Sequence, residues 1–214
     1  MPSVFGGIFF FFCSRIFATV SECYLALPFG LIFVLTFLSD GVNIFIKRRC
    51  AMQIKRATLS DLARIEDIYR EAREFMKISG NASQWGTSYP ARELLLSDIE
   101  SENLYTVVEN DELLAVFYFR IGEDPTYRVI KAGEWKNDLP YGVIHRIAVG
   151  KNAHGKGVSR FCFDYAFALS GNLKIDTHRD NAPMRRALEK CGFEYCGVIN
   201  LENGDERIAF QKTK

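Results

Sequence analysis

The chain lacks the features that mark several common classes of protein. Its 27 Lys and Arg residues are balanced by 26 Asp and Glu, which gives a net charge of +1 without any polybasic patch. Binding through phosphate contacts normally requires a strong basic excess, so we expect no nucleic-acid partner. The six cysteines form no CxxC pair and have no metal-ligand spacing, so we expect no metal. Such cysteines are typical of a reduced, cytoplasmic protein.

Charged residues are also scarce at the start of the chain. Residues 1–51 contain only six of them, but they hold ten of the eighteen phenylalanines. Residues 23–39 form a run of 17 uncharged residues, near the minimum for a membrane span, although Pro28 and Gly30 interrupt it. The basic residues 47–49 would keep the following domain in the cytoplasm. A membrane anchor is therefore one explanation, and only in that case would the protein contact a membrane.

A second explanation, a cleaved signal peptide, is disfavoured because the basic residues follow the apolar run and no Ala-x-Ala-like site precedes residue 52. The third explanation is that translation starts at Met52. From there onward the composition is an ordinary soluble mixture, and the first residues look like a strand. We favour this explanation, which divides the chain into an apolar extension, residues 1–51, and one folded domain, residues 52–214.

Strand and helix patterns alternate along residues 52–214. Periodicity and turn residues predict seven strands, over residues 53–58, 105–108, 113–119, 141–149, 173–178, 195–201 and 207–212. Helices are predicted to begin after Ser60 or Asp61, to cover residues 91–100 and 158–169, and to begin after Asp180 or Asn181. Residues 122–140 show no clear period. No internal repeat is visible, and 48% hydrophobic residues suffice for one substantial core.

A glycine-bearing turn lies between the strand over residues 141–149 and the helix that follows it. Gly155 and Gly157 let the backbone approach an anion closely. The free N–H groups of the first helical turn and the helix dipole then face that anion, which predicts a phosphate cradle. The turn lacks the spacing of a Walker A loop, and Arg160 stands where a dinucleotide fingerprint has its third glycine.

The order of elements resembles that of the GNAT superfamily, which are acyl-CoA-dependent N-acyltransferases. The family motif Gln/Arg-x-x-Gly-x-Gly/Ala falls on residues 154–159, where only Gly157 matches it strictly. A second block is closer to the family, because Asn181 is followed by the Glu-Lys pair 189–190 and the Gly-Phe pair 192–193. The resemblance covers residues 52–214. It implies an α/β (α+β) fold, a mixed twisted sheet of about seven strands with about four flanking helices and splayed central parallel strands.

The resemblance also implies that acetyl-CoA is the co-substrate and that certain residues bind it. The backbone of Ile147, Ala148 and Val149 would pair with the pantetheine arm where this strand splays from its parallel neighbour. The side-chain amide of Asn181 would position the pantetheine end. Main-chain N–H groups of the turn would hold the pyrophosphate, and the turn consists of His154, Gly155, Lys156, Gly157, Val158 and Ser159.

Acetyl transfer to an amine requires a base for the ammonium, donors for the oxyanion and an acid for the thiolate. His145 is our candidate base, because an imidazole titrates near neutral pH and some GNAT amine acetyltransferases carry a His at this position. Strand alternation predicts that it shares one face with Val143, Ile147 and Val149. A core histidine bonded to a neighbouring strand is the alternative. His178 is a weaker candidate base, which Asp176 on the same strand face could orient.

Two parts of the site are less determined. Leu188 stands where many GNAT enzymes have the Tyr that protonates the thiolate, and Tyr141, Tyr195 or water would have to replace it. If nothing does, the domain is a non-catalytic acyl-CoA-binding module, which is the alternative to an N-acetyltransferase.

The acceptor would be an amine of a small molecule or a peptide. Aromatic and acidic loop residues could bind it or could simply anchor their loops, and they are Trp85, Tyr89, Tyr127, Glu134 and Trp135. The sequence shows no strongly acidic cleft for a polyamine. It leaves open whether the protein is a monomer or a homodimer.

Overall fold

The computed structural model describes the backbone of residues 21–26, 31–38, 41–48 and 51–214, and side chains from residue 51 onward. The chain divides into two units, Met1–Met52 and Gln53–Lys214. In the first unit, an antiparallel sheet has the order β1 (Ser21–Ala26), β2 (Leu31–Leu38) and β3 (Gly41–Arg48).

The run of residues 23–39, considered above as a membrane anchor, includes residues 27–30 and 39, which lie outside the described residues. Among the residues that the structure describes, no helix is long and apolar enough to cross a membrane.

The second unit is built on a seven-stranded mixed sheet with the order β4-β5-β6-β7-β8-β10-β9. All neighbouring strands are antiparallel except β7 and β8, which are parallel. This arrangement confirms the predicted fold. The strands are β4 (Gln53–Arg56), β5 (Leu104–Glu109), β6 (Glu112–Ile121), β7 (Gly142–Val149), β8 (Asn172–Thr177), β9 (Glu194–Asn200) and β10 (Glu206–Thr213).

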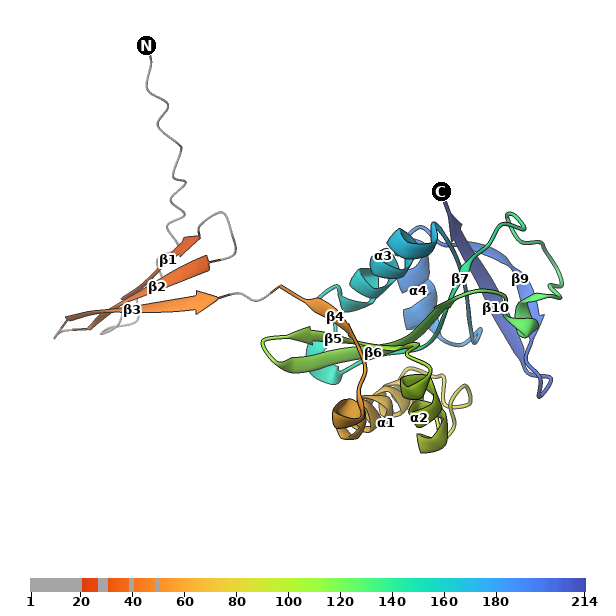
Figure 1. The fold of residues 1–214 in the computed structure, drawn as a ribbon, viewed down its shortest axis with the longest axis horizontal. Helices are drawn as coiled ribbons and strands as arrows, with labels where there is room; N and C mark the ends of the chain where they lie inside the picture. Colours follow the sequence, from red (N-terminus) through yellow and green to blue (C-terminus); the bar gives the residue numbers. More distant parts are fainter. Residues whose placement is uncertain (1–20, 27–30, 39–40, 49–50) are drawn as a thin grey trace, which may run out of the picture. The chain divides into compact units, whose positions relative to one another are not determined.

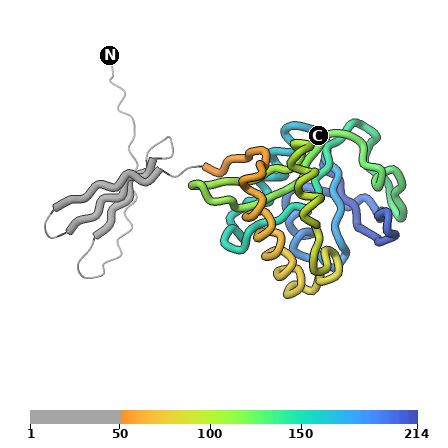
Figure 2. Tube along the Cα trace, turned by 60° about the horizontal axis from the view of Figure 1, so that its bottom comes forward, coloured from red at the N-terminus to blue at the C-terminus, as the bar shows by residue number. Residues whose placement is uncertain are grey.

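Four helices flank this sheet. Helices α1 (Leu62–Ile78) and α2 (Arg92–Glu100) cover one face, and α3 (Val158–Ser170) and α4 (Ala182–Lys190) cover the other (Figure 1; Figure 2 shows the same layers after a 60° turn). Short 3-10 turns, Leu59–Asp61, Pro125–Tyr127 and Lys151–Ala153, occur in the connections.

The ends of the helices follow from local hydrogen bonds. Asn181 caps α4, because its side-chain oxygen accepts a hydrogen bond from the N–H of Met184 at 3.2 Å. Gly171 ends α3 with a φ of 65°, and its N–H donates to the carbonyl of Phe167. Before α1, the Asp61 carboxylate accepts from the N–H of Thr58 in a capping box of the 3-10 turn, and Asp61 makes no side-chain cap hydrogen bond to α1 itself.

Apolar side chains fill the space between the helices and the sheet. On one face, Ile65 and Ile68 of α1 are fully buried in a cluster that includes Val116 of β6 and Ala148 of β7. On the other face, Phe163 of α3 packs edge-on against Phe193, with ring centroids 5.3 Å apart.

Helical spacing puts Val158, Phe161, Cys162, Tyr165 and Leu169 on one face of α3, and the buried face of the helix differs from this one. Val158 and Cys162 are buried as expected, but Leu169 is 53% exposed and Phe163 is buried in its place. The contact of Phe163 with Phe193 accounts for this difference, because Phe193 comes from beyond α4, which the spacing within α3 could not reveal.

The two parallel strands separate along their length, as predicted. Strands β7 and β8 pair only at Gly142 with Leu173 and at Val143 with Lys174. Beyond Val143 the β8 side of β7 has no ladder partner in the described sheet, while its other side stays paired with β6. This separation leaves main-chain groups of β7 available to a ligand.

Strand β7 also contains a bulge, which corrects the predicted alternation. Tyr118 pairs with His145 and Val116 pairs with Ala148, so one residue of β6 faces two of β7. Arg146 is the extra residue, with a φ of 50°. Ala148 therefore follows His145 on the same face, and the prediction that Ile147 and Val149 share the face of His145 was wrong.

Candidate functional site

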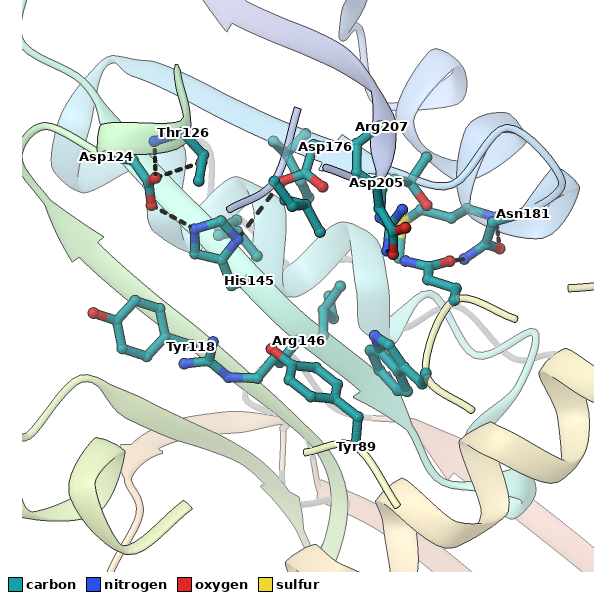
Figure 3. A pocket seen from close by; sticks show the side chains of 18 of the residues that line it. Tyr89, Tyr118, Asp124, Thr126, His145, Arg146, Asp176, Asn181, Asp205 and Arg207 are labelled. Atoms are coloured by element: carbon teal, nitrogen blue, oxygen red, sulfur yellow. Dashed lines mark hydrogen bonds and ion pairs between the residues drawn. The ribbon is translucent and has the colours of Figure 1, made fainter. Parts of the chain in front are cut away.

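A polar cleft of about 670 Å³ lies over the separated strands, between the helix face that carries α1 and the C-terminal strands. Its charged side chains come from five stretches that are distant in the sequence, and Figure 3 labels most of them. They are Asp98, Arg120, Asp124, His145, Arg146, Asp176, Asp205 and Arg207. Four carboxylates and three guanidinium groups lie in this lining, so the cleft is not strongly acidic.

His145 lies between two carboxylates in this cleft. Its Nε2 is 2.8 Å from Oδ2 of Asp124, and its Nδ1 is 3.7 Å from Oδ1 of Asp176. Asp124 sits in the loop between β6 and β7, and Asp176 is on β8. Because the side chain of His145 remains 22% exposed, a ligand in the cleft can reach the imidazole.

Asp124 is held as an anion. Its Oδ1 accepts hydrogen bonds from the N–H and the hydroxyl of Thr126, at 2.9 and 2.5 Å. Burial alone would raise the pKa of Asp124, but the hydrogen bonds from His145 and Thr126 outweigh it and hold this pKa below its ordinary value. An ionised Asp124 accepts the Nε2–H of His145, which leaves the lone pair on Nδ1, facing Asp176.

Tyr127 supports the second carboxylate. Its hydroxyl donates a hydrogen bond of 2.7 Å to Oδ1 of Asp176. Burial raises the pKa of Tyr127, and the neighbouring Asp176 carboxylate raises it further, so the phenol keeps its proton and acts as a donor. The ring itself is 2% exposed, so Tyr127 supports the cleft from beneath and does not offer its face to an acceptor.

Arg146, the bulged residue, is fixed on three sides. Its Nη2 donates to Oδ2 of Asp98 on α2 at 2.7 Å, and its guanidinium lies 4.5 Å from the ring centroid of Tyr118 on β6. The hydroxyl of Tyr69 on α1 donates to the Arg146 carbonyl at 2.8 Å. Burial raises the pKa of Asp98 despite the opposing effect of Arg146. These contacts hold the bulge, which sets which of the residues after it share the face of His145.

A second cleft, of about 700 Å³, contains the predicted phosphate cradle and is called the cradle cleft below. Every residue expected to bind acetyl-CoA lines it except Lys156. Gly155 and Gly157 have φ values of 77° and 79°, and a Cβ at either position would meet no protein atom within 4 Å. The space beside them is therefore open to a ligand.

The N–H groups at the start of α3 are also available to bind an anion. Phe161 is the first residue of α3 whose N–H reaches back to a carbonyl, that of Gly157. The N–H groups of Val158, Ser159 and Arg160 precede it in the first turn and have no carbonyl one turn earlier. His154 flanks the turn, where its Nε2 is 3.1 Å from the Val149 carbonyl oxygen.

The two clefts meet. Both are lined by the same four residues, which are Met76, Ile147, Asn181 and Met184. The side-chain amide of Asn181 donates to Oε1 of Gln84 at 3.0 Å while its oxygen caps α4. An amide nitrogen carries two hydrogens, so Asn181 has one more donor at the junction.

The fold places only some of the remaining predicted site residues in the two clefts. His178 lines neither cleft, and its Nδ1 accepts from the N–H of Asp180 at 3.2 Å, so Asp176 does not orient it as expected. Trp135 also lines neither cleft, because its indole N–H donates to the Tyr127 carbonyl. By contrast, Trp85 and Tyr89 line the polar cleft, Trp85 as a buried wall and Tyr89 with 40% exposure.

The tyrosines suggested as an acid are not placed for that role. Tyr141 accepts a hydrogen bond from the N–H of Asp124, and Tyr195 lines neither cleft. Leu188 is fully buried in the core. Tyr118 and Tyr89 are the two tyrosines that line the polar cleft.

Sequence reasoning missed Asp124, Arg146 and Arg207 as site residues. Asp124 precedes Pro125 and Thr126, a pattern that signals a capped turn, but nothing in it shows that the turn faces β7. Arg146 reads as an ordinary strand residue until the bulge is seen. Arg207 lies on the last strand, and only the sheet order brings it beside β8.

The chain is similar to known proteins in sequence and in fold. The model of the acetyltransferase (GNAT) family matches residues 62–193. A GNAT-family acetyltransferase from Streptococcus agalactiae is 28% identical with a TM-score of 0.70, over 76% of this chain and 95% of that one. No curated protein sequence matches the chain.

Two more distant structures bear on the fold alone. The Salmonella typhimurium protein yncA, solved with its cofactor acetyl-CoA, is 17% identical with a TM-score of 0.52, over 76% of this chain and 94% of that one. A ribosomal-protein-alanine N-acetyltransferase from Brucella melitensis is 17% identical with a TM-score of 0.53, over 76% and 99%.

Proposed function

The chain belongs to the GNAT acetyltransferase family, and we propose that it transfers the acetyl group of acetyl-CoA to a primary amine of a small molecule or a peptide. The observation that carries this proposal is the junction of the two clefts at Ile147 and Asn181. One cleft offers a phosphate cradle and the other a histidine between carboxylates, so a thioester at the junction would face both.

Acetyl-CoA would lie along the cradle cleft. The N–H groups at the start of α3 would bind its pyrophosphate, where the helix dipole favours negative charge. The unpaired side of β7 beyond Val143 would accept the amide groups of the pantetheine arm. The spare N–H of Asn181 would then lie near the thioester end of that arm.

The acceptor would enter the polar cleft as an ammonium ion. Asp176 attracts this cation, and Nδ1 of His145 takes its proton, because Asp124 holds the other ring nitrogen. The neutral amine then attacks the thioester carbonyl carbon. The C–N bond forms and the C–S bond breaks. The attacking nitrogen loses its second proton to solvent, and the departing thiolate takes a proton from solvent.

Thiol release from acetyl-CoA tests this proposal. The full chain should release free CoA thiol when given a suitable amine from a broad panel. His145→Ala should lower kcat by roughly 10²- to 10⁴-fold, the usual contribution of a general base, without weakening CoA binding. His178→Ala is the matched control and should retain activity, because His178 lines neither cleft.

The second candidate function, an acyl-CoA-binding module, is favoured by Leu188, which supplies no hydroxyl to the thiolate and is fully buried. Tight CoA binding by calorimetry without turnover across the whole amine panel would establish the module and overturn the transferase. Equal rates for His145→Ala and the unaltered protein would remove His145 from the mechanism.

A further inference from the structure

A buried arginine with unused hydrogen-bond donors lies at one end of the polar cleft. Arg207 is only 6% exposed and lines the cleft. Its Nη1 donates to the Glu206 carbonyl at 2.9 Å, and its Nη2 is 3.7 Å from Oδ2 of Asp205. The second contact is too long for a hydrogen bond, and the Asp205 side chain is 56% exposed. A guanidinium has five N–H donors, so most of them remain for another acceptor.

Burying a guanidinium without hydrogen-bond partners costs free energy. A buried charge normally has a close partner and satisfied hydrogen bonds, because its removal from water is otherwise uncompensated. Spare donors on a guanidinium this deeply buried indicate a missing polar ligand.

Arg207 faces the same space as the proposed base. The register of β10 and β8 pairs Ala209 with Asp176, and alternation puts Arg207 on the face of Ala209. His145, Asp176 and Arg207 therefore follow one another across neighbouring strands, as Figure 3 shows. Strand β10 is paired with β8 at a spacing of about 4.8 Å, so an anion at Arg207 would lie on the strand next to Asp176, within the span of a short amino-carboxylic acid.

The geometry points to an acceptor that carries a carboxylate beside its amine, with Arg207 as the residue that binds this carboxylate. The inference rests on the proposed function, because it places the amine between Asp176 and His145. The planar guanidinium matches a carboxylate with two parallel hydrogen bonds. Asp205 at 3.7 Å reduces the positive charge of this corner, which favours a singly charged carboxylate over a phosphate. The acceptor class is thus a free amino acid or a short amino-carboxylic acid.

Matched pairs of acceptors test this inference. Initial rates of thiol release are measured for the full chain with the L-amino acids, β-alanine and γ-aminobutyrate, and with their carboxamides. The kcat/KM of the best acids should exceed that of their amides by about 10²-fold or more, because the amide leaves the buried charge unpaired. O-phosphoethanolamine is included as the phosphate counterpart. A preference for it, or equal rates for acids and amides, would overturn the inference.

The arginine is tested with a neighbour as its control. Arg207→Gln should lower kcat/KM for the acids by about 10²-fold and for the amides by less than about threefold. Arg207→Lys keeps the positive charge but lacks the two parallel N–H donors of the guanidinium. Its loss of kcat/KM for the acids should therefore be intermediate. Arg179→Gln should change neither rate, because Arg179 is exposed, pairs with Glu206 at 2.6 Å and lines neither cleft. If both Arg207 variants lost kcat/KM by the same factor for acids and for amides, Arg207 would not be the residue that binds the carboxylate.

A binding measurement separates this inference from the function on which it rests. Calorimetry of the best-preferred amino acid is carried out on the protein loaded with CoA, with and without Arg207→Lys. Arg207-dependent binding without any turnover supports the carboxylate site and overturns the transferase. Turnover of amines without regard to their carboxylate supports the transferase and overturns the carboxylate site. Thermal unfolding of each variant shows whether a loss of activity is due to misfolding. If Arg207→Gln misfolds, the rates of Arg207→Lys test the carboxylate site.

Discussion

Replacing Asp124 with Asn removes one charge from the polar cleft with almost no change in shape. The carboxylate accepts from Thr126 at Oδ1 and faces Nε2 of His145 at 2.8 Å. Its pKa is lowered by these hydrogen bonds, so it is ionised at every pH at which an amine would be acetylated. The amide of Asn would keep the volume but could offer an N–H to Nε2. That N–H would force the ring proton onto Nδ1, the atom that must accept the proton of the acceptor.

The size of the effect follows from these two losses. A hydrogen bond to a charged group contributes about 1.5–3 kcal/mol, which corresponds to roughly 10- to 150-fold in rate. The change of tautomer removes the base itself, whose contribution is roughly 10²- to 10⁴-fold. We therefore expect Asp124→Asn to lower kcat by at least about 10²-fold, close to the loss in His145→Ala.

The assay is thiol release from acetyl-CoA at several pH values, with CoA binding measured by calorimetry on the same samples. Asp180→Asn is the matched control, because Asp180 is a carboxylate 3.5 Å from the ring of the other candidate, His178, and lies outside both clefts. Asp124→Asn should bind CoA normally and turn over slowly, and Asp180→Asn should do both normally. An Asp124→Asn protein with kcat within about threefold of the unaltered protein would refute the pairing.

Two further predictions concern the cradle and stability. Gly157→Ala and Gly204→Ala should each cost about 1 kcal/mol of stability, because both glycines have a positive φ, but only the former should weaken CoA binding, by about tenfold or more. Calorimetry and thermal unfolding check both, and equal CoA affinity in the two variants would contradict the cradle. Because the pKa of Asp124 is lowered from its ordinary 3.8, its ionised form stabilises the fold above that pH, and this contribution is lost as the pH falls further. The stability difference between the unaltered protein and Asp124→Asn should therefore shrink from pH 5 to pH 2 in urea unfolding, and a difference independent of pH would contradict this assignment.

The fold could be read from the sequence because its signals are local. Asn110 and Asp111, both with positive φ in the structure, join β5 to β6 between two of the predicted strands, and Gly171 ends α3 just after the predicted range 158–169. Asn181 caps α4 through a bond that spans three residues. Each of these elements depends on neighbours within one turn or one hairpin, which is the range that sequence patterns report.

The polar cleft could not be read in the same way, because its contacts are long-range. Asp124 meets His145 across 21 residues, and Arg146 meets Asp98 across 48. Residues 122–140 have no period, since the segment is held by single side chains such as Asp124 and Trp135 and not by a repeating face. A pattern search finds repeating faces, so it passes over a loop whose residues each make one distant contact.

The bulge at Arg146 links the missed contacts to the two clefts. Regular alternation would have put Ile147 and Val149 on the face of His145. With one extra residue, Ala148 follows His145 on that face instead, Ala148 and Val149 both line the cradle cleft, and Ile147 lies at the junction of the two clefts. The residues that hold the bulge, Tyr69 and Asp98, come from α1 and α2, which carry no chemistry themselves. The first two helices therefore contribute to the reaction by fixing where one strand changes face.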